Sequence, residues 1–292
     1  MNEDLGRTIR TITMCAAVAS ALFVATFGMT ACARRSAAKQ ISFRIGRIEH
    51  DRISESSGVI ASRRFPGVFW THNDRGNAPA LFAIKRGGEL VSEVRIGAKN
   101  QDWEDIAIDA EGRLYIAQTG NNDYTKTAAF VLRIVEPDPH FKPRGRYQRI
   151  AVEKKWELRY PDHPFDSEAL FVCEGFGYLI SKERKGQAAM LYRFPLSESD
   201  KPLVLEHVAT LPLHTAVTGA DITPDGKYLA VVHTTAIEVF QLDGRPERGD
   251  WSACARFPLS PPHDIEGCCF TQGGILATSE SRDIFFFPFT GK

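Results

Sequence analysis

Short apolar runs, separated by glycine-containing turns and polar loops, recur along the chain from about residue 50 onward. One unit shows the pattern: an apolar run at residues 103–108, a turn at Glu111-Gly112, a second run at 114–117, a polar loop, and a third run at 130–135. Apolar runs of this length, bounded by turn residues, predict β-strands. No run outside residues 12–31 has the length of a convincing helix, so the pattern predicts an all-β protein.

The unit occurs five times along the chain. Its first strand is expected at residues 55–60, 103–108, 166–171, 219–222 and 265–268, and a fourth strand between units at 90–96, 150–158, 204–211 and 252–257. Four strands at a period of about 50 residues predict a β-propeller. Each unit starts in the middle of a blade, so residues 41–48 are expected to supply the missing outer strand of the last blade. Five blades are favoured. A sixth could lie in the long gap after the second unit, although residues 137–146 are more typical of a loop and hairpin extension.

The N-terminal segment has the pattern of an export signal. Arg7 and Arg10 precede an apolar run at residues 12–31, which ends in Met29-Thr30-Ala31-Cys32. This ending resembles the bacterial lipobox, in which the cysteine is acylated. Ordinary secretion with cleavage near Ala31 and a retained transmembrane helix are the alternatives. We therefore predict an export signal at 1–33, a short linker at 34–40 and a single propeller domain at 41–292. The protein is expected in the periplasm or at the cell surface, held to the membrane by lipid on Cys32.

The amino-acid composition limits the classes of molecule that the chain is expected to bind. The chain has 36 Lys+Arg and 36 Asp+Glu residues and no basic stripe, which argues against nucleic-acid binding. We expect a monomer that binds a small molecule or an envelope ligand. The cysteines show no CxxC pair and no zinc-ligand spacing, and the strands that carry them are too far apart for disulfides, so buried free thiols are expected. A bridge between the adjacent Cys268 and Cys269 is the alternative.

The predicted topology gathers polar residues at one mouth of the central channel. In a propeller blade, loops that enter the first strand and loops that leave the second lie on the same face. These loops carry many acids and amides, including Asp102 and Asp166, at the rim. The candidate metal ligands are Glu55, Asn73, Asp74, Glu104, Asp105, Asn121, Glu168, Asp221 and Glu266. Such oxygen ligands suit Ca²⁺ best. The structural alternative is that these acids accept hydrogen bonds from backbone amides and lock neighbouring blades together.

Four histidines in or near these loops are candidate general acids or bases: His72, His163, His233 and His263. A bound cation together with a histidine would support hydrolysis of a phosphoester or a lactone. Each histidine taken alone is more typical of a hydrogen-bonded loop residue. The chain contains no G-x-S-x-G elbow, no H-E-x-x-H, no P-loop and no dinucleotide fingerprint.

Several short motifs carry a family resemblance. They are ESSG at 55–58, His72-Asn73-Asp74, DWEDIA at 102–107, GNN at 120–122 followed by Glu136-Pro137, DSEAL at 166–170 and VTGAD at 217–221. On these motifs the chain resembles a group of secreted bacterial β-propeller proteins without an assigned activity. More loosely, it resembles phytase-like and SdiA-regulated propellers and calcium-dependent lactonase propellers. The resemblance implies a binding role, with a calcium-dependent phosphoesterase or lactonase as the alternative.

Overall fold

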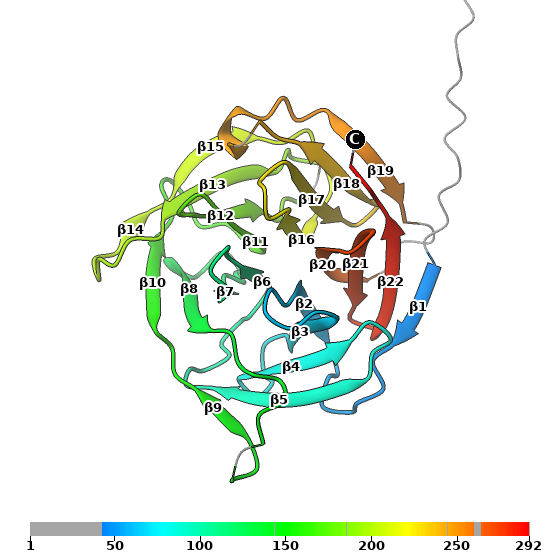
Figure 1. The fold of residues 1–292 in the computed structure, drawn as a ribbon. Coiled ribbons are helices and arrows are strands. Elements are labelled where there is room, and N and C mark those ends of the chain that lie inside the picture. Colours follow the sequence, from blue (N-terminus) through cyan, green and yellow to red (C-terminus); the bar gives the residue numbers. More distant parts are fainter. Residues whose placement is uncertain (1–42, 143, 185, 244, 260–263, 292) are drawn as a thin grey trace, which may run out of the picture. The chain divides into compact units, whose positions relative to one another are not determined.

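Five β-sheets surround a central axis in the computed structural model, which describes residues 43–291 except 143, 185, 244 and 260–263 (Figure 1). Blade 1 contains β2 (Ser56–Ala61), β3 (Val68–Asn73), β4 (Ala80–Lys85) and β5 (Leu90–Ile96). Blade 2 contains β6 (Ile106–Ile108), β7 (Arg113–Gln118), β8 (Ala128–Val135) and β10 (Lys154–Arg159). Blade 3 contains β11 (Ser167–Cys173), β12 (Phe176–Ser181), β13 (Met190–Pro195) and β15 (Glu206–Thr210). Blade 4 contains β16 (Val217–Ile222), β17 (Tyr228–His233), β18 (Ala236–Gln241) and β19 (Ala253–Pro258). Blade 5 contains β20 (Ile265–Thr271), β21 (Gly274–Ser279), β22 (Asp283–Pro288) and β1 (Phe43–Arg47).

The five-bladed propeller predicted from the sequence is confirmed, and the option of a sixth blade is wrong. The gap after the second unit instead leads into β9 (Gln148–Ile150), which pairs in parallel with β5 as a fifth strand of blade 1. Similarly, β14 (Leu203–Val204) pairs in parallel with β10 of blade 2. Each of these short strands lies in the connection between the third and fourth strands of its own blade, and it ties that connection to the outer edge of the preceding blade. A 3-10 turn, η1 (Pro246–Arg248), interrupts the loop before β19.

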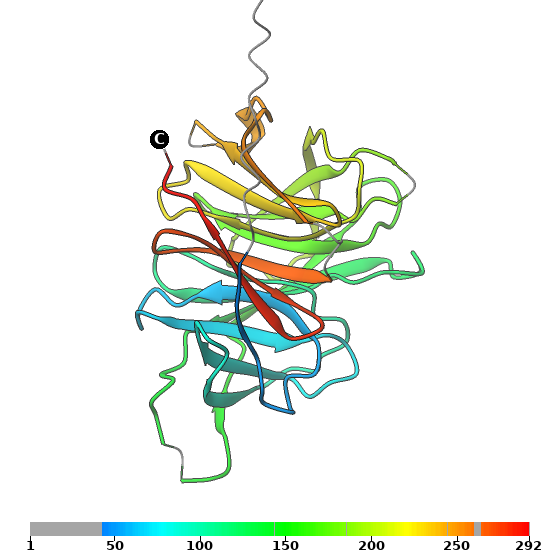
Figure 2. The ribbon, with the colours of Figure 1, turned by 90° about the vertical axis from the view of Figure 1, so that its right-hand side faces the viewer.

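The N-terminal strand closes the ring, as predicted. β1 runs antiparallel to β22, so the first and last described strands lie side by side (Figures 1 and 2). Arg44 and Arg47 each contact the carboxylate of Asp283 at 2.9 Å. A Cβ on Gly46 would lie 2.2 Å from the carbonyl oxygen of Gly87, so only glycine permits this close approach of β1 to the β4–β5 turn. The seam is therefore held by ladder bonds, ion pairs and close backbone packing.

The core lies between neighbouring blades, and for that reason the inner strands are buried on both faces. β3, β16 and β21 are buried along their whole length. Trp70, Trp103 and Trp156 are fully buried between the blades. The described cysteines, at 173, 254, 268 and 269, are all free as predicted, but Cys254 is exposed.

The predicted export signal, the linker, Cys32 and His263 lie outside the described residues. Within the described part of the chain, no helix is long and apolar enough to cross a membrane.

Candidate metal site

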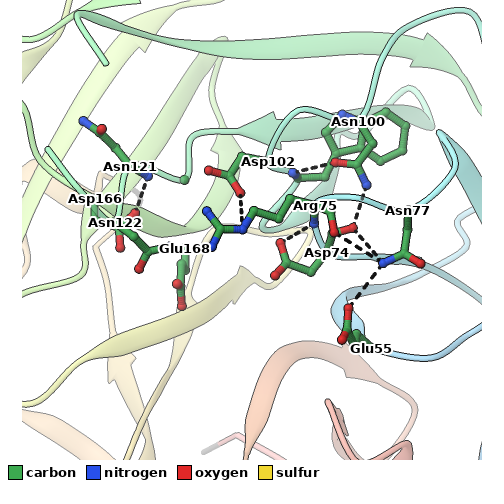
Figure 3. A network of polar contacts seen from close by, with 12 residues as sticks. Glu55, Asp74, Arg75, Asn77, Asn100, Asp102, Asn121, Asn122, Asp166 and Glu168 are labelled. Carbon is green, nitrogen blue, oxygen red and sulfur yellow. Dashed lines mark hydrogen bonds and ion pairs between the residues drawn. The ribbon is translucent and has the colours of Figure 1, made fainter. Parts of the chain in front are cut away.

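Three carboxylates from two blades meet at one mouth of the central channel. Asp74 follows β3, whereas Asp102 precedes β6 (Figure 3). Glu104 also precedes β6. One oxygen from each carboxylate lies within 4.8 Å of the others. Asp102 and Glu104 are 2% and 5% exposed, and Asp74 is partly buried. We call these three residues the acidic triad.

Amide side chains hold the two triad loops together. Asn100 donates from Nδ2 to the carbonyl oxygens of Asn73 (3.0 Å) and Asp74 (2.9 Å), and its Oδ1 accepts from the Trp103 N–H (Figure 3). Asn77 donates to the Asp74 carbonyl at 3.2 Å. The backbone that carries the triad is therefore tied across the boundary between blades 1 and 2, which preorganises the carboxylates.

Gly120, in the loop after β7, leaves room for the triad. A Cβ at this position would lie 1.9 Å from Oε1 of Glu104 and 2.5 Å from Cγ of Asp102. Any side chain here would push the carboxylates from their positions.

Two surface cations face the triad. The Lys126 ammonium contacts Oδ2 of Asp102 and the carbonyl of Gly120, and Arg75 Nε lies 3.9 Å from Oδ1 of Asp102. The side chains of Lys126 and Arg75 are 43% and 57% exposed, so both can move into solvent. Oδ1 of Asp102 is buried and has no hydrogen-bond partner among the described residues.

A second acidic group lies beside the triad, at the start of β11 and β20. Lys182 pairs with Glu168, and the guanidinium of Arg184 lies 3.6 Å from Oδ2 of Asp166. In the described part of the chain, Oε2 of Glu168 and Oδ2 of Asp166 are buried without a hydrogen-bond partner. Glu266 is partly buried near Glu168.

Burial and mutual repulsion raise the pKa values of the acids at this mouth. The pKa of Glu104 lies well above its usual value because of burial, with further contributions from Glu168 and Asp74. Burial raises the pKa of Glu168 to about 7, although Lys182 opposes the shift. Burial, followed by the charge of Glu168, raises the pKa of Glu266 to about 9. Without a bound cation, Glu266 therefore retains its proton at neutral pH, and Glu168 is about half protonated there.

Two predicted ligands instead accept hydrogen bonds from backbone amides. Asp105 is fully buried and accepts from the N–H groups of Ile106, Leu170 and Ala220, which belong to three inner strands. Asp221 accepts from the Phe270 N–H at 2.7 Å. Asp105 and Asp221 therefore follow the structural alternative, in which a carboxylate accepts hydrogen bonds from backbone amides and holds neighbouring blades together. Burial raises the pKa of Asp105 well above its usual value and that of Asp221 to about 7.

The remaining predicted ligands have local partners. Asn73 accepts from the Glu55 N–H and donates to the Arg52 carbonyl. Asn121 holds its own loop by accepting from the Lys126 N–H at 2.9 Å. Glu55 is exposed and accepts from Asn77 at 3.3 Å (Figure 3).

The described candidate histidines do not join the triad. His72 is fully buried with its ring edge-on to Trp103, and burial lowers its pKa to about 4. The Nδ1 of His233 contacts the hydroxyls of Thr215 (2.7 Å) and Thr235 (3.2 Å), and burial lowers its pKa. His163 is exposed in the loop before β11.

Two residues of the site were missing from the predicted ligand set. Asp102 was assigned to the rim but not to the ligands, and Lys126 was not considered. Strand alternation could have identified Asp102, because in the DWEDIA motif residues 102 and 104 project to one side and residue 105 to the other. No local pattern marks Lys126.

Comparison with known proteins gives only distant structural likenesses. No protein-family model matches the chain, and no curated protein matches it either. Hydrazine synthase from Kuenenia stuttgartiensis is 15% identical, with 81% of this chain and 72% of that chain covered, at a TM-score of 0.46. A gluconolactonase from Xanthomonas campestris is 15% identical, with 85% and 82% covered, at a TM-score of 0.45. A virginiamycin B lyase variant from Staphylococcus aureus, solved with quinupristin, is 13% identical, with 81% and 67% covered, at a TM-score of 0.42. Likenesses at this level carry no argument about the fold or the activity of this chain.

Proposed function

We propose that this protein binds a divalent cation, Ca²⁺ in particular, at the acidic triad and uses it to capture a small oxygen-rich ligand, glycan or envelope partner. The observation that carries the proposal is the spacing of the triad oxygens, all within 4.8 Å of one another. Oxygens that each lie about 2.4 Å from one Ca²⁺ are separated by at most about 4.8 Å. The triad therefore has the donor atoms and the spacing of a calcium site.

The unpartnered oxygens strengthen this assignment. A buried carboxylate oxygen without a hydrogen-bond partner carries a desolvation cost. Oδ1 of Asp102 and Oε2 of Glu168 are both in this condition at the mouth. A cation would supply the missing partner and relieve the repulsion that raises the pKa of Glu104. Lys126 and Arg75 are the competitors that occupy part of this space.

The triad leaves coordination positions for a ligand. Ca²⁺ takes about six to eight oxygens, and three carboxylates that each offer one oxygen supply only part of that number. Hydroxyl or carboxylate oxygens of a captured molecule would complete the shell, which favours a polyhydroxylated or acidic ligand at this mouth.

We also propose that the chain is exported and acylated on Cys32, and that it belongs to the secreted propeller group that its motifs resemble. Calcium sites of extracellular modules typically have dissociation constants of about 0.1–1 mM. If the protein is exposed to Ca²⁺ at such concentrations, a triad site with an affinity in this range would be occupied. Membrane fractionation tests the anchor: Cys32→Ala should move the protein from the membrane pellet to the soluble envelope fraction, and an unchanged pellet would contradict acylation.

Calcium titration by calorimetry, with thermal melting in parallel, tests the cation site. Wild type should bind one Ca²⁺ and gain about 2.7 kcal/mol at a hundredfold excess over Kd. Asp102→Asn and Glu104→Gln should lose this gain. Asp225→Asn is the matched control, because Asp225 lies on a hairpin turn at the opposite face and pairs with Lys227. The proposal fails if millimolar Ca²⁺ leaves the melting of wild type unchanged. It also fails if Asp102→Asn, Glu104→Gln and Asp225→Asn all respond to Ca²⁺ as wild type does.

Hydrolysis at the same mouth is the second candidate function, and the protonation of Glu168 favours it. A carboxyl group with a pKa of about 7 beside a cation can act as a general acid or base. A phosphoester and lactone panel tests this role. Turnover that requires Ca²⁺ and is lost in Glu104→Gln and Glu168→Gln would establish hydrolysis, whereas ligand binding without turnover would leave the binding function.

A further inference from the structure

The face opposite the acidic triad contains a cavity of about 930 Å³. Its walls come from the β2–β3, β16–β17 and β20–β21 turns, the β4–β5 turn, and the residues after β22. These turns lie at the opposite ends of the blade strands from the face that carries the triad. The cavity thus covers the other end of the channel, across blades 4, 5 and 1, and its volume suits a small organic ligand.

Two arginines give the cavity positive charge. Arg63 lies directly after β2, and its Nε is buried without a hydrogen-bond partner among the described residues. Arg86 lines the cavity from the β4–β5 turn, with its guanidinium 3.9 Å from the centre of the Phe286 ring. Neither forms an ion pair with a carboxylate of the described chain at 4 Å or less. The acid of the lining, Asp225, is already paired with Lys227 at 3.0 Å.

The loop that carries Arg63 is held rigidly. The Phe65 N–H donates to Oγ of Ser62 at 2.8 Å, and the Ser62 N–H donates to the Val68 carbonyl at 3.0 Å. The Arg63 guanidinium is therefore presented by a fixed turn, so little ordering is needed when an anion binds.

Aromatic side chains also line the cavity. The Phe289 ring packs edge-on to Tyr228, with centroids 5.1 Å apart, and its centroid is 6.0 Å from that of Phe270. Phe270 is fixed in turn by the bond from its N–H to Asp221. A planar apolar body fits against such a wall, with an anionic group turned toward Arg63.

We propose that this cavity, which we call the arginine cavity, binds a small aromatic carboxylate whose carboxylate pairs with Arg63 and whose ring packs against Phe270 and Phe289. The buried Nε of Arg63 has no hydrogen-bond partner among the described residues, and charge-assisted bonds from a guanidinium to a carboxylate favour an anion over a neutral ligand. The charge of Arg63 also opposes the raised pKa of Asp221, so a bound anion would share the guanidinium with that carboxyl group. The site does not depend on the cation site, because the two lie on opposite faces.

The test uses 2-naphthoate as the probe, with 2-naphthamide as its uncharged analogue, in calorimetric titrations of the whole chain. Wild type should bind one 2-naphthoate saturably, and the amide at least about tenfold more weakly, since a hydrogen bond to a charged group contributes a factor of about ten or more. Arg63→Gln should weaken 2-naphthoate binding by about the same factor. Gln272→Trp, on an exposed turn of the lining, should block binding without any change of charge.

Arg159→Gln is the control, because Arg159 is exposed on blade 2 and its ion pair in the described part of the chain is with its neighbour Glu157. It should bind as wild type does, and so should wild type in EDTA. No saturable binding up to millimolar probe, or equal binding of acid and amide, would overturn the proposal. Loss of probe binding in Asp102→Asn would place the probe at the acidic triad and would also overturn it. Melting curves identify any variant that fails to fold. If Arg63→Gln fails to fold, Arg86→Gln, which changes an exposed side chain of the same cavity, replaces it in the 2-naphthoate titration.

Discussion

Stability of the cation-free protein should fall as the pH rises, and Glu168 should account for much of the fall. The carboxyl group has a pKa of about 7 in the folded chain, against 4.5 for its ordinary value. Below pH 4.5 the folded and unfolded states both hold the proton, so Glu168 contributes nothing to the pH dependence. Between pH 4.5 and 7 only the folded state holds it, so each rise in pH favours unfolding. Above pH 7 neither state holds the proton, and the folded state bears the full cost of a charged, buried Glu168.

The magnitude follows from the pKa difference. A shift of about 2.5 units, at about 1.36 kcal/mol per unit, corresponds to a loss of about 3 kcal/mol between pH 4.5 and pH 8. The side chain is only 8% exposed, so solvent screens little of this energy. In a domain of this size the change lowers Tm by roughly 10 °C.

Urea unfolding in EDTA at several pH values measures the effect. Wild type should lose stability across this range, and Glu168→Gln should show a slope flatter by about 3 kcal/mol in total. The free energy of unfolding of this variant can also be lower than that of wild type at every pH, because Lys182 loses its partner. Such a constant difference does not change the slope of stability against pH. Glu111→Gln, which changes a carboxylate that is 66% exposed, is the control and should keep the wild-type slope. Saturating Ca²⁺ should restore stability at pH 8. Parallel wild-type and Glu168→Gln profiles would refute the assignment of a buried, protonated Glu168.

Other predictions test the same architecture. Lys126→Met should tighten Ca²⁺ binding about tenfold, because it removes the ammonium that competes for Asp102; an unchanged or weaker affinity in calorimetry would show that Lys126 does not occupy the cation position. Gly120→Ala should weaken Ca²⁺ binding at least about tenfold with a small change in Tm, since its Cβ displaces the flexible end of Glu104; wild-type affinity would contradict the close approach. Asp105→Ala should destabilise the fold by about 3 kcal/mol or more in urea unfolding, because three buried N–H groups lose their acceptor; a loss below about 1 kcal/mol would rule out the blade-locking role.

The strand pattern was sufficient for the ring and its closure. Each blade strand had its own apolar alternation and turn, and the incomplete last unit required an outer strand from the N-terminal end. The short parallel strands β9 and β14 could not be predicted in the same way. Each pairs with a strand distant in sequence, and two or three residues contain no periodicity that specifies a partner.

The site was predicted to the level of one mouth, but not to individual ligands. Topology alone brings the loops together, which explains why Asp74 and Glu104, two members of the acidic triad, were among the predicted ligands. Strand alternation separates Asp105 from Asp102 and Glu104, but it does not show which side faces the channel, because Asp105 is held by amides of Leu170 and Ala220 from distant strands as well as by its neighbour Ile106. Whether a loop acid faces the channel or a backbone amide depends on strand register across blades, which a single sequence does not encode locally.

The pairing of β1 with β22 also imposes an order of events during synthesis. The ion pair across this seam joins residues 236 positions apart, so the contact closes almost the longest loop that the chain can form. A ribosome must translate nearly all of the propeller before β1 meets its partner. Until then β1 stays unpaired, and the blades behind it form an open arc rather than a ring. A nascent chain with this connectivity therefore stays unclosed for most of its translation.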